Sequence, residues 1–355
     1  MTDITPFLRS LLDLPGLSGY EKPASEMIAK QWQSLVDEIT TSTLGSLHGL
    51  RKAHGSTKAP RIMIATHMDA IGMMVTKIDQ GLLRFTHVGG VDPRILPGQA
   101  VIVHGRRVLR GIVQLIPDRL LDSHSAGNAP DYKFLFVDVG LPEKEILKLV
   151  QPGDLISFAQ NSFEMDGGYV AGHSLDNRAS VAALTICLEE LRNIELAWDV
   201  YAVATIKEEE SGLGALTSAY AIRPDLAVTI DVTFAKGPDS TDYRSFPLGK
   251  GPSIGVGANI HPVLVTEFTK LAKEMDMPYG MEMMAKSSGT DSMMMQITAE
   301  GIPNMVLGIP IRYMHTSVEL VSVNDIYRTG KLLARFISQL KTDSAKALFE
   351  KFANE

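Results

Sequence analysis

The sequence predicts an α/β domain interrupted by a smaller β-rich domain. Before residue 71 and after residue 166, helix-like and strand-like segments alternate. Between these positions, short apolar runs alternate with Gly, Pro and Asp turns, which is typical of a small barrel or sandwich. The length of 355 residues exceeds one usual domain. We therefore expect an α/β domain from residues 1–70 and 167–355, and an inserted domain over residues 71–166.

The first part of the α/β domain begins with two predicted helices. The first covers residues 5–14 and ends at Pro15-Gly16. Ser18-Gly19-Tyr20-Glu21 then has the spacing of a capping box, ahead of a helix that reaches residue 36. The apolar run 61–66 predicts a strand that is covered on both faces.

The remaining elements follow the same logic. In the insert we expect one helix at 142–150 and six strands, at 73–78, 82–87, 100–104, 108–116, 133–137 and 155–158. After the insert, strands are expected at 199–206, 225–231 and 304–309, and helices at 178–193, 261–275 and 323–340. The tail from residue 342 has a helical composition.

Composition excludes several classes of protein. The net charge of −7 and the lack of a Lys/Arg run argue against a nucleic-acid or anionic-membrane partner. The single cysteine, Cys187, excludes an internal disulfide framework and a thiolate metal cluster, and its apolar surroundings predict a buried helix residue. The N-terminus lacks a secretory pattern, and no apolar run is long enough to span a bilayer. We expect a cytoplasmic protein.

Polar residues follow the predicted strands where each strand ends. Three adjacent carboxylates, Glu208, Glu209 and Glu210, follow the strand 199–206; in isolation they would suit a solvated turn, but inside a pocket they require a cation. In open α/β sheets ligands bind at the carboxyl ends of the strands. Imidazole and carboxylate together suit zinc, cobalt or manganese, and are sufficient for two metals that share a carboxylate. The residues at strand ends are His67, Asp69, Glu208, Glu209, Asp231 and His315, and Asp176 joins them from a predicted helix start.

This set, in this order and spacing, resembles the M42 family of metallo-aminopeptidases. These are the glutamyl aminopeptidase and tetrahedral aminopeptidase relatives, some of which carry an endoglucanase label. The similarity covers nearly the whole chain, including residues 15–21 and 88–98. It implies a three-layer α/β/α di-metal peptidase domain with an inserted small β-barrel that serves dimerisation. It further implies that dimers assemble into a hollow tetrahedral homododecamer that admits short peptides.

The resemblance also implies roles for the metal-binding residues. Asp176 would bridge two divalent ions, zinc or cobalt or manganese. His67 and Asp231 would hold one or the other ion, and Glu209 and His315 would complete the two shells.

The same resemblance assigns two residues to the chemistry. Glu208 would be the general base, and Asp69 would hydrogen-bond His67 and fix its tautomer. The family usually reads Gln-Glu-Glu-Val-Gly where this chain reads Lys207-Glu208-Glu209-Glu210-Ser211, so the register stays open by one residue. Gly214-Ala215 favours Glu208 as base and Glu209 as ligand, with Glu210 as the fallback.

The implied function is a metal-dependent aminopeptidase that acts on short peptides. The alternatives are a metal-independent glycosidase with paired carboxylates, a catalytically silent assembly or binding protein, and a related di-metal carboxypeptidase or deacetylase. The preferred N-terminal residue, the identity of the metal, and the roles of Arg312 and of the turn at 287–291 stay open.

Five further histidines are expected to be structural or surface residues, with His173 as the best exception because it lies close to Asp176 in sequence. They are His87, His104, His124, His173 and His261.

Overall fold

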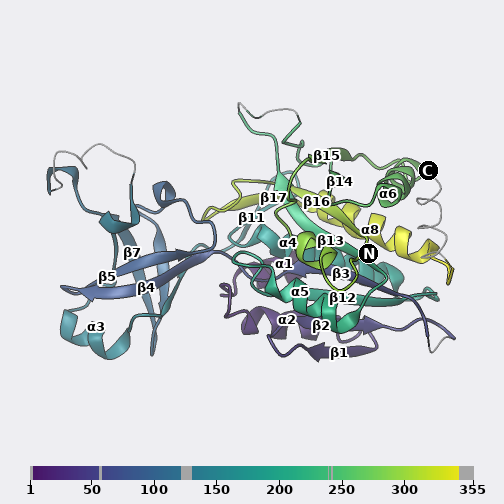
Figure 1. The fold of residues 1–355 in the computed structure, drawn as a ribbon. Helices are drawn as coiled ribbons and strands as arrows, with labels where there is room; N and C mark the ends of the chain where they lie inside the picture. The colour runs from purple at the N-terminus through teal and green to yellow at the C-terminus, as the bar shows by residue number, and fades with distance from the viewer. Residues whose placement is uncertain (1–2, 56–57, 121–129, 239, 241–242, 344–355) are drawn as a thin grey trace.

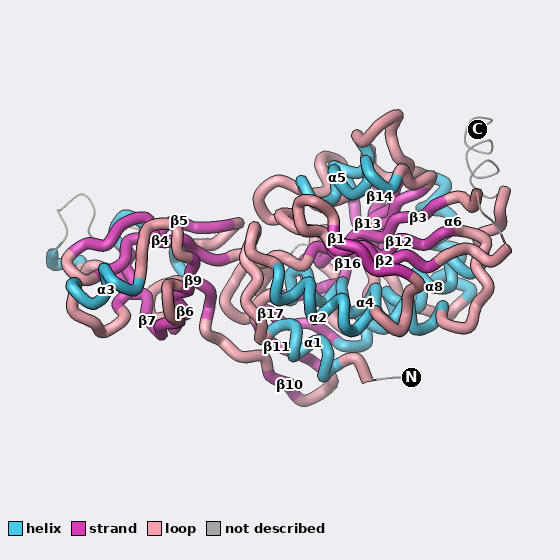
Figure 2. Tube along the Cα trace, turned by 90° about the horizontal axis from the view of Figure 1, so that it is seen from below, coloured by secondary structure: helices cyan, strands magenta, loops and turns pink. Residues whose placement is uncertain are grey.

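The protein consists of a large sheet covered by helices and a β-barrel that projects from one end of it (Figure 1 and Figure 2). The computed structural model describes residues 3–55, 58–120, 130–238, 240 and 243–343. The expected α/β fold with a small inserted barrel is confirmed. No helix in these ranges is both long enough and apolar enough to cross a membrane.

The centre of the large sheet is parallel. Its four central strands, in spatial order, are β12 (Asp199–Thr205), β3 (Arg61–His67), β13 (Leu226–Phe234) and β16 (Asn304–Arg312). On the β12 side follow β2 (Leu47–Arg51) and β1 (Glu38–Thr41); on the β16 side follow β17 (Glu319–Ser322), β11 (Tyr169–Gly172) and β10 (Phe163–Met165). β14 (Ser253–Gly257) also pairs with β16 and carries β15 (Gly280–Met284). The parallel centre brings four carboxyl ends to one edge.

Two helical layers cover the sheet, as Figure 2 shows. Ile62 and Ile64 of β3 belong to the larger core, whereas Met63 and Ala65 belong to a smaller core on the opposite face. The larger core contains residues of α1 (Thr5–Leu12), α2 (Lys22–Trp32), α4 (Leu175–Leu191), α6 (Pro262–Glu274) and α8 (Val323–Gln339). The smaller core contains residues of α5 (Leu213–Ile222) and α7 (Ser292–Gln296). The alternation along a buried strand therefore produces the three layers.

Helix α4 is the central helix of the larger layer. It packs on β3 and β13 and against α8, and is buried along nearly its whole length. This burial explains why its sequence lacks an amphipathic stripe. Cys187 lies inside it, as expected, and burial raises the pKa of its thiol.

The barrel is closed by six strands around its own apolar core. In spatial order these are β4 (Gly72–Asp79), β5 (Leu82–Val88), β8 (Leu135–Asp138), β7 (Val108–Leu115), β6 (Ala100–His104) and β9 (Leu155–Phe158). Closure pairs each of the six strands with two neighbours, so none of them is an edge strand. The helix α3 (Glu143–Leu149) covers it through Ile146. β10 belongs to the large sheet, so the chain has returned there by Phe163.

Some local predictions are wrong. The predicted capping box does not form, because the Ser18 hydroxyl donates to Asp69 and the Glu21 carboxylate accepts from the backbone N–H groups of Gly19 and Lys207. The predicted strand 133–137 begins only at residue 135, after the 3-10 turn η3 (Tyr132–Phe134).

Other predicted boundaries shift by a few residues. β13 and β16 each run three residues beyond their predicted ends, and α2 ends four residues before its predicted end. The part of the predicted helical tail from residue 344 onward, and His124, lie outside the described residues.

Candidate metal centre

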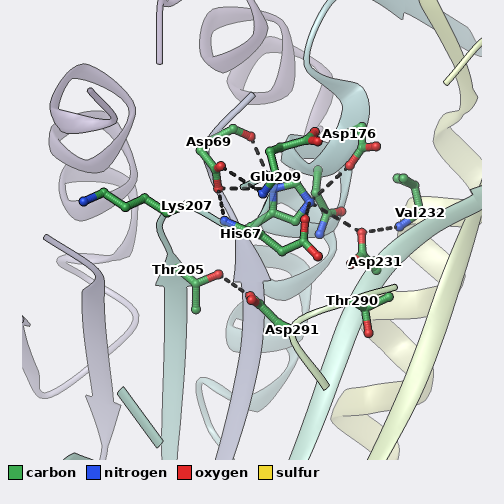
Figure 3. A network of polar contacts seen from close by, with 12 residues as sticks. His67, Asp69, Asp176, Thr205, Lys207, Glu209, Asp231, Val232, Thr290 and Asp291 are labelled. Atoms are coloured by element: carbon green, nitrogen blue, oxygen red, sulfur yellow. Dashed lines mark hydrogen bonds and ion pairs between the residues drawn. The ribbon is translucent and has the colours of Figure 1, made fainter. Parts of the chain in front are cut away.

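The carboxyl edge of the parallel strands gathers the predicted site residues. His67 is the last residue of β3, and the turn after β12 carries Glu208 and Glu209. Asp231 points from β13, three residues before that strand ends, and His315 follows β16. Asp176 lies at the start of α4, where the backbone is not yet helical and its peptide bond to Asn177 is cis. Segments far apart in the sequence thus meet at one place (Figure 3).

His67 lies at the centre of the cluster and is 2% exposed. Its Nε2 atom is 3.1 Å from Asp176, 3.6 Å from Asp231 and 3.7 Å from Glu208. Its Nδ1 atom faces the other way and lies 3.3 Å from the backbone carbonyl of Asp69 and 3.5 Å from its carboxylate. The Nδ1 contact leaves Nε2 directed at the three carboxylates, the orientation that a metal ligand needs.

His315 contacts the carboxylate of Asp176, which His67 also contacts. Its Nε2 atom lies 3.3 Å from Oδ2 of Asp176 and 3.5 Å from Oε2 of Glu209. The Asp176 oxygen that faces His67 is the other one, Oδ1. The two oxygens of Asp176 therefore face two different histidines. The backbone of His315 is left-handed, with φ of +61°, an uncommon conformation for a non-glycine residue.

Asp69 organises the polar network behind His67. It is fully buried, and its carboxylate accepts the Ser18 hydroxyl at 2.5 Å and the backbone N–H groups of Glu208 at 3.1 Å and Glu209 at 3.3 Å. Burial raises the pKa of Asp69, but His67, Ser18 and the Glu208 N–H outweigh it, so that the pKa is lowered and the group stays charged. One carboxylate thus positions a histidine and the turn that carries two glutamates.

The electrostatics of the cluster favour a bound cation. Burial, reinforced by neighbouring carboxylates, raises the pKa of Glu208 to about 9 and the pKa of Glu209 well above its usual range. Burial acts on Asp176 in the same direction, but hydrogen bonds with His315 and His67 lower its pKa. Negative charge is thus crowded at this edge, and a divalent ion would relieve that repulsion.

The donor atoms also fit a metal ion. One ligand atom each of His67, Asp176 and Glu209 lie within 4.8 Å of one another. The Oε1 atom of Glu209 is buried and has no hydrogen-bond partner among the described residues, which leaves it free to coordinate. Nitrogen and oxygen donors without sulfur suit zinc, cobalt or manganese.

The third glutamate of the triplet points elsewhere. The carboxylate of Glu210 accepts the backbone N–H of Gly89 at 2.6 Å, whereas Glu208 and Glu209 face His67 and His315.

Several residues near the site carried no recognisable sequence signal. Glu319 is 1% exposed and accepts the backbone N–H groups of both Asp176 and His315 at 3.0 Å. Glu282 accepts the hydroxyls of Thr233 and Ser253 in the wall of the cleft. Both are single glutamates within β-like sequence, and only their burial distinguishes them.

The remaining predicted residues fall around the site. Residues 287–290 line a cleft of about 580 Å³ that opens on the cluster, and Asp291 lies buried beneath it, accepting the Thr205 hydroxyl. Arg312 instead donates to the backbone carbonyl of Lys236 and does not line the cleft.

His173 is structural in its contacts. Its ring nitrogens face the backbone carbonyls of Ile71 at 3.2 Å and Thr316 at 3.4 Å. Burial lowers its pKa to about 4, which keeps the ring neutral near pH 7.

A three-layer α/β/α fold with imidazole and carboxylate donors at its carboxyl edge is an arrangement suited to metal-dependent hydrolysis. The family model described as M42 glutamyl aminopeptidase matches residues 45–332. The chain is 34% identical to a lysyl aminopeptidase of Pyrococcus furiosus, over 94% of this chain and 96% of the relative. The chain belongs to the M42 peptidase family and is a peptide-bond hydrolase.

Solved structures agree with this family membership. An aminopeptidase from the archaeon Desulfurococcus kamchatkensis superposes with a TM-score of 0.89 at 32% identity, covering 97% of both chains. The Pyrococcus horikoshii TET1 peptidase, described as able to assemble into a tetrahedron or a large octahedral shell, superposes with a TM-score of 0.82 at 28% identity. That match covers 95% of this chain and all of the other.

Metal should stabilise the folded chain through this cluster. After removal of metal with a chelator, we expect added zinc or cobalt to raise the melting temperature, because an ion at one hundred times its Kd contributes about 2.7 kcal/mol. Asp176→Asn should lose most of this shift, whereas Asp166→Asn, at an exposed carboxylate, should keep it. Differential scanning calorimetry measures both; an Asp176→Asn protein that responds to metal as fully as the wild type contradicts the assignment.

Proposed function

We propose that this protein removes N-terminal amino acids from short peptides with two divalent metal ions bound at the cluster. The observation that carries the proposal is the placement of Asp176 between two histidines. One of its carboxylate oxygens faces His67 and the other faces His315. A carboxylate in that position can bridge two ions, the arrangement used in two-metal hydrolysis.

The distances suggest how the ligands divide. His67 lies 3.6 Å from Asp231, and His315 lies 3.5 Å from Glu209, so each histidine is accompanied by its own carboxylate. We assign the first pair to one ion and the second pair to the other, with Asp176 shared.

Glu208 is the proposed general base. When bound, the two ions would polarise the scissile carbonyl and lower the pKa of the attacking water. Glu208 lines the cleft beside His67, and bound cations would lower its pKa from the value of about 9 that burial imposes. The resulting carboxylate would accept a proton from that water and pass it to the leaving nitrogen. The hydroxyl adds to the carbonyl carbon, the C–N bond breaks, and the amine departs with the proton. Asp69 keeps this base in place through the Glu208 N–H.

The charge of the cleft supports the choice of a free N-terminus. Carboxylates of the cluster line it, whereas none of its described lining residues is a lysine or arginine. A positively charged terminal ammonium is attracted to such a surface, and a blocked terminus is not. The names of the relatives include both lysyl and glutamyl aminopeptidase, so the preferred terminal residue is a matter for assay.

We further propose a homo-oligomeric assembly built through the barrel. The TET1 relative is described as able to assemble into a tetrahedron or a large octahedral shell. The inserted domain exposes the apolar side chains of Val108, Ile112 and Leu147. Such exposed apolar groups are candidates for a subunit interface.

The general base can be tested by substitution. Glu208→Gln should still bind metal but lose about 10²- to 10⁴-fold in kcat, because an amide cannot accept the proton. Glu210→Gln is the matched control, since its amide oxygen can still accept the Gly89 N–H, and it should keep most of the wild-type turnover. Steady-state kinetics and metal analysis of each protein measure these effects. Near-normal turnover in Glu208→Gln would refute the assignment of Glu208 as the general base.

A substrate panel separates the competing functions. We expect hydrolysis of aminoacyl-anilides and short peptides with a free N-terminus, complete loss after exhaustive chelation, and no cleavage of N-acetylated peptides. Activity on oligosaccharides that survives chelation would indicate a glycosidase. Cleavage or deacetylation of blocked peptides would indicate a carboxypeptidase or deacetylase. A metal-loaded protein inactive on all of them would be a silent assembly protein.

The assembly can be tested by light scattering. The purified protein should have a mass many times that of a single 355-residue chain, near twelve-fold for a tetrahedral dodecamer. A mass equal to one chain at micromolar concentration contradicts the assembly.

A further inference from the structure

A short segment of the barrel side reaches into the metal centre. We call residues Val88-Gly89-Gly90-Val91, which begin at the last residue of β5, the glycine strap. The Gly89 N–H donates to the Glu210 carboxylate at 2.6 Å. The Gly90 carbonyl lies 3.1 Å from Nδ1 of His315. The strap therefore contacts both the glutamate turn and a proposed metal ligand.

The contact between the Gly90 carbonyl and His315 sets the tautomer of the His315 ring. A carbonyl only accepts, so the Gly90 contact places the Nδ1 proton toward the strap. The Nε2 atom of His315 is then available toward Asp176 and Glu209, at 3.3 and 3.5 Å. Partners of this kind fix the tautomer and orientation of a histidine ligand.

Close packing explains why two glycines stand here. A Cβ atom at residue 90 would lie 2.5 Å from Nδ1 of His315, too close for the ring to keep its place. At residue 89 a Cβ atom would lie 2.6 Å from Ile71, and the φ of +74° also favours glycine. The backbone can approach the histidine only because both side chains are missing.

The other end of the strap is held by the barrel. The Tyr132 hydroxyl donates to the Val91 carbonyl at 2.5 Å, and Nδ1 of His87 lies 2.8 Å from the Gly89 carbonyl. The Tyr132 ring packs on His87 and, edge-on, on Phe85. Burial raises the pKa of Tyr132 to about 12, so the hydroxyl keeps the proton that it donates.

We propose that the glycine strap is a positioning element of the metal centre, through which the barrel orients His315 and sets the affinity for the ion that His315 holds. This inference rests on the proposed two-metal function. Tyr132 acts in it as a positioning residue that touches neither metal nor substrate. Since coupling is reciprocal, metal binding should in turn hold the strap in place.

Metal affinity measured ion by ion tests the proposal. The method is a competition titration of chelator-treated protein with zinc against a chromophoric chelator. Gly90→Ala should lower the affinity for one of the two zinc ions about 10- to 100-fold and leave the affinity for the other near its wild-type value. Tyr132→Phe, which keeps the ring contacts and removes one hydrogen bond, should lower the affinity for the same ion about 2- to 12-fold. Gly237→Ala, where no atom of a described residue lies within 4 Å of the added Cβ, is the matched control and should leave the affinity for both ions unchanged.

The outcomes separate the inference from the function on which it depends. If wild-type protein binds no zinc, the proposed function fails first. If it binds two ions and both variants, folded by circular dichroism, bind them as the wild type does, the strap proposal is overturned. An equal loss of affinity for both ions in each variant would also overturn the strap proposal, because such a loss indicates a general loss of structure. If Gly90→Ala does not fold, Tyr132→Phe decides alone.

Discussion

The crowding of negative charge at one edge of a sheet is the constraint on which the site depends. Five carboxylates stand at or beside His67: Asp69, Asp176, Glu208, Glu209 and Asp231. Among the described residues, their ion pairs are with His67 and His315 alone. Buried like charges at such distances repel strongly, and two imidazoles cannot neutralise five carboxylates. The fold therefore presents a site whose charge and donor atoms suit a bound cation.

Much of this could be predicted because buried parallel strands leave a plain sequence signature. An apolar run followed at once by a polar residue marks a strand that ends at an edge, as at His67 and after Thr205. Three such strands predicted where the site would lie. The resemblance, and not the spacing, supplied the predictions that Asp176 is the shared carboxylate and Glu208 the base.

The rest depended on tertiary contacts that have no local pattern. Ser18 and Glu21 have the spacing of a helix cap, yet their partners are Asp69 and the Lys207 N–H, far along the chain. Glu319 is a single glutamate at the start of β17. Nothing in the neighbouring sequence indicates that its carboxylate accepts the backbone N–H groups of Asp176 and His315. The cytoplasmic location stays a prediction from composition.

The barrel and the α/β domain are linked by more than the covalent chain. The strand β5 leads directly into the glycine strap, which contacts the turn after β12 and the loop after β16. The barrel, which we propose to serve assembly, would thus also contribute backbone groups to the metal centre. That arrangement offers a physical route by which events at the barrel reach the chemistry.

The most direct test of the account is anomalous X-ray diffraction from crystals soaked in zinc or cobalt. We predict two anomalous peaks, one on each side of the Asp176 carboxylate, the first near His67 and the second near His315. A single peak, or none, with Asp176 and His315 out of reach of a common ion, would contradict the account.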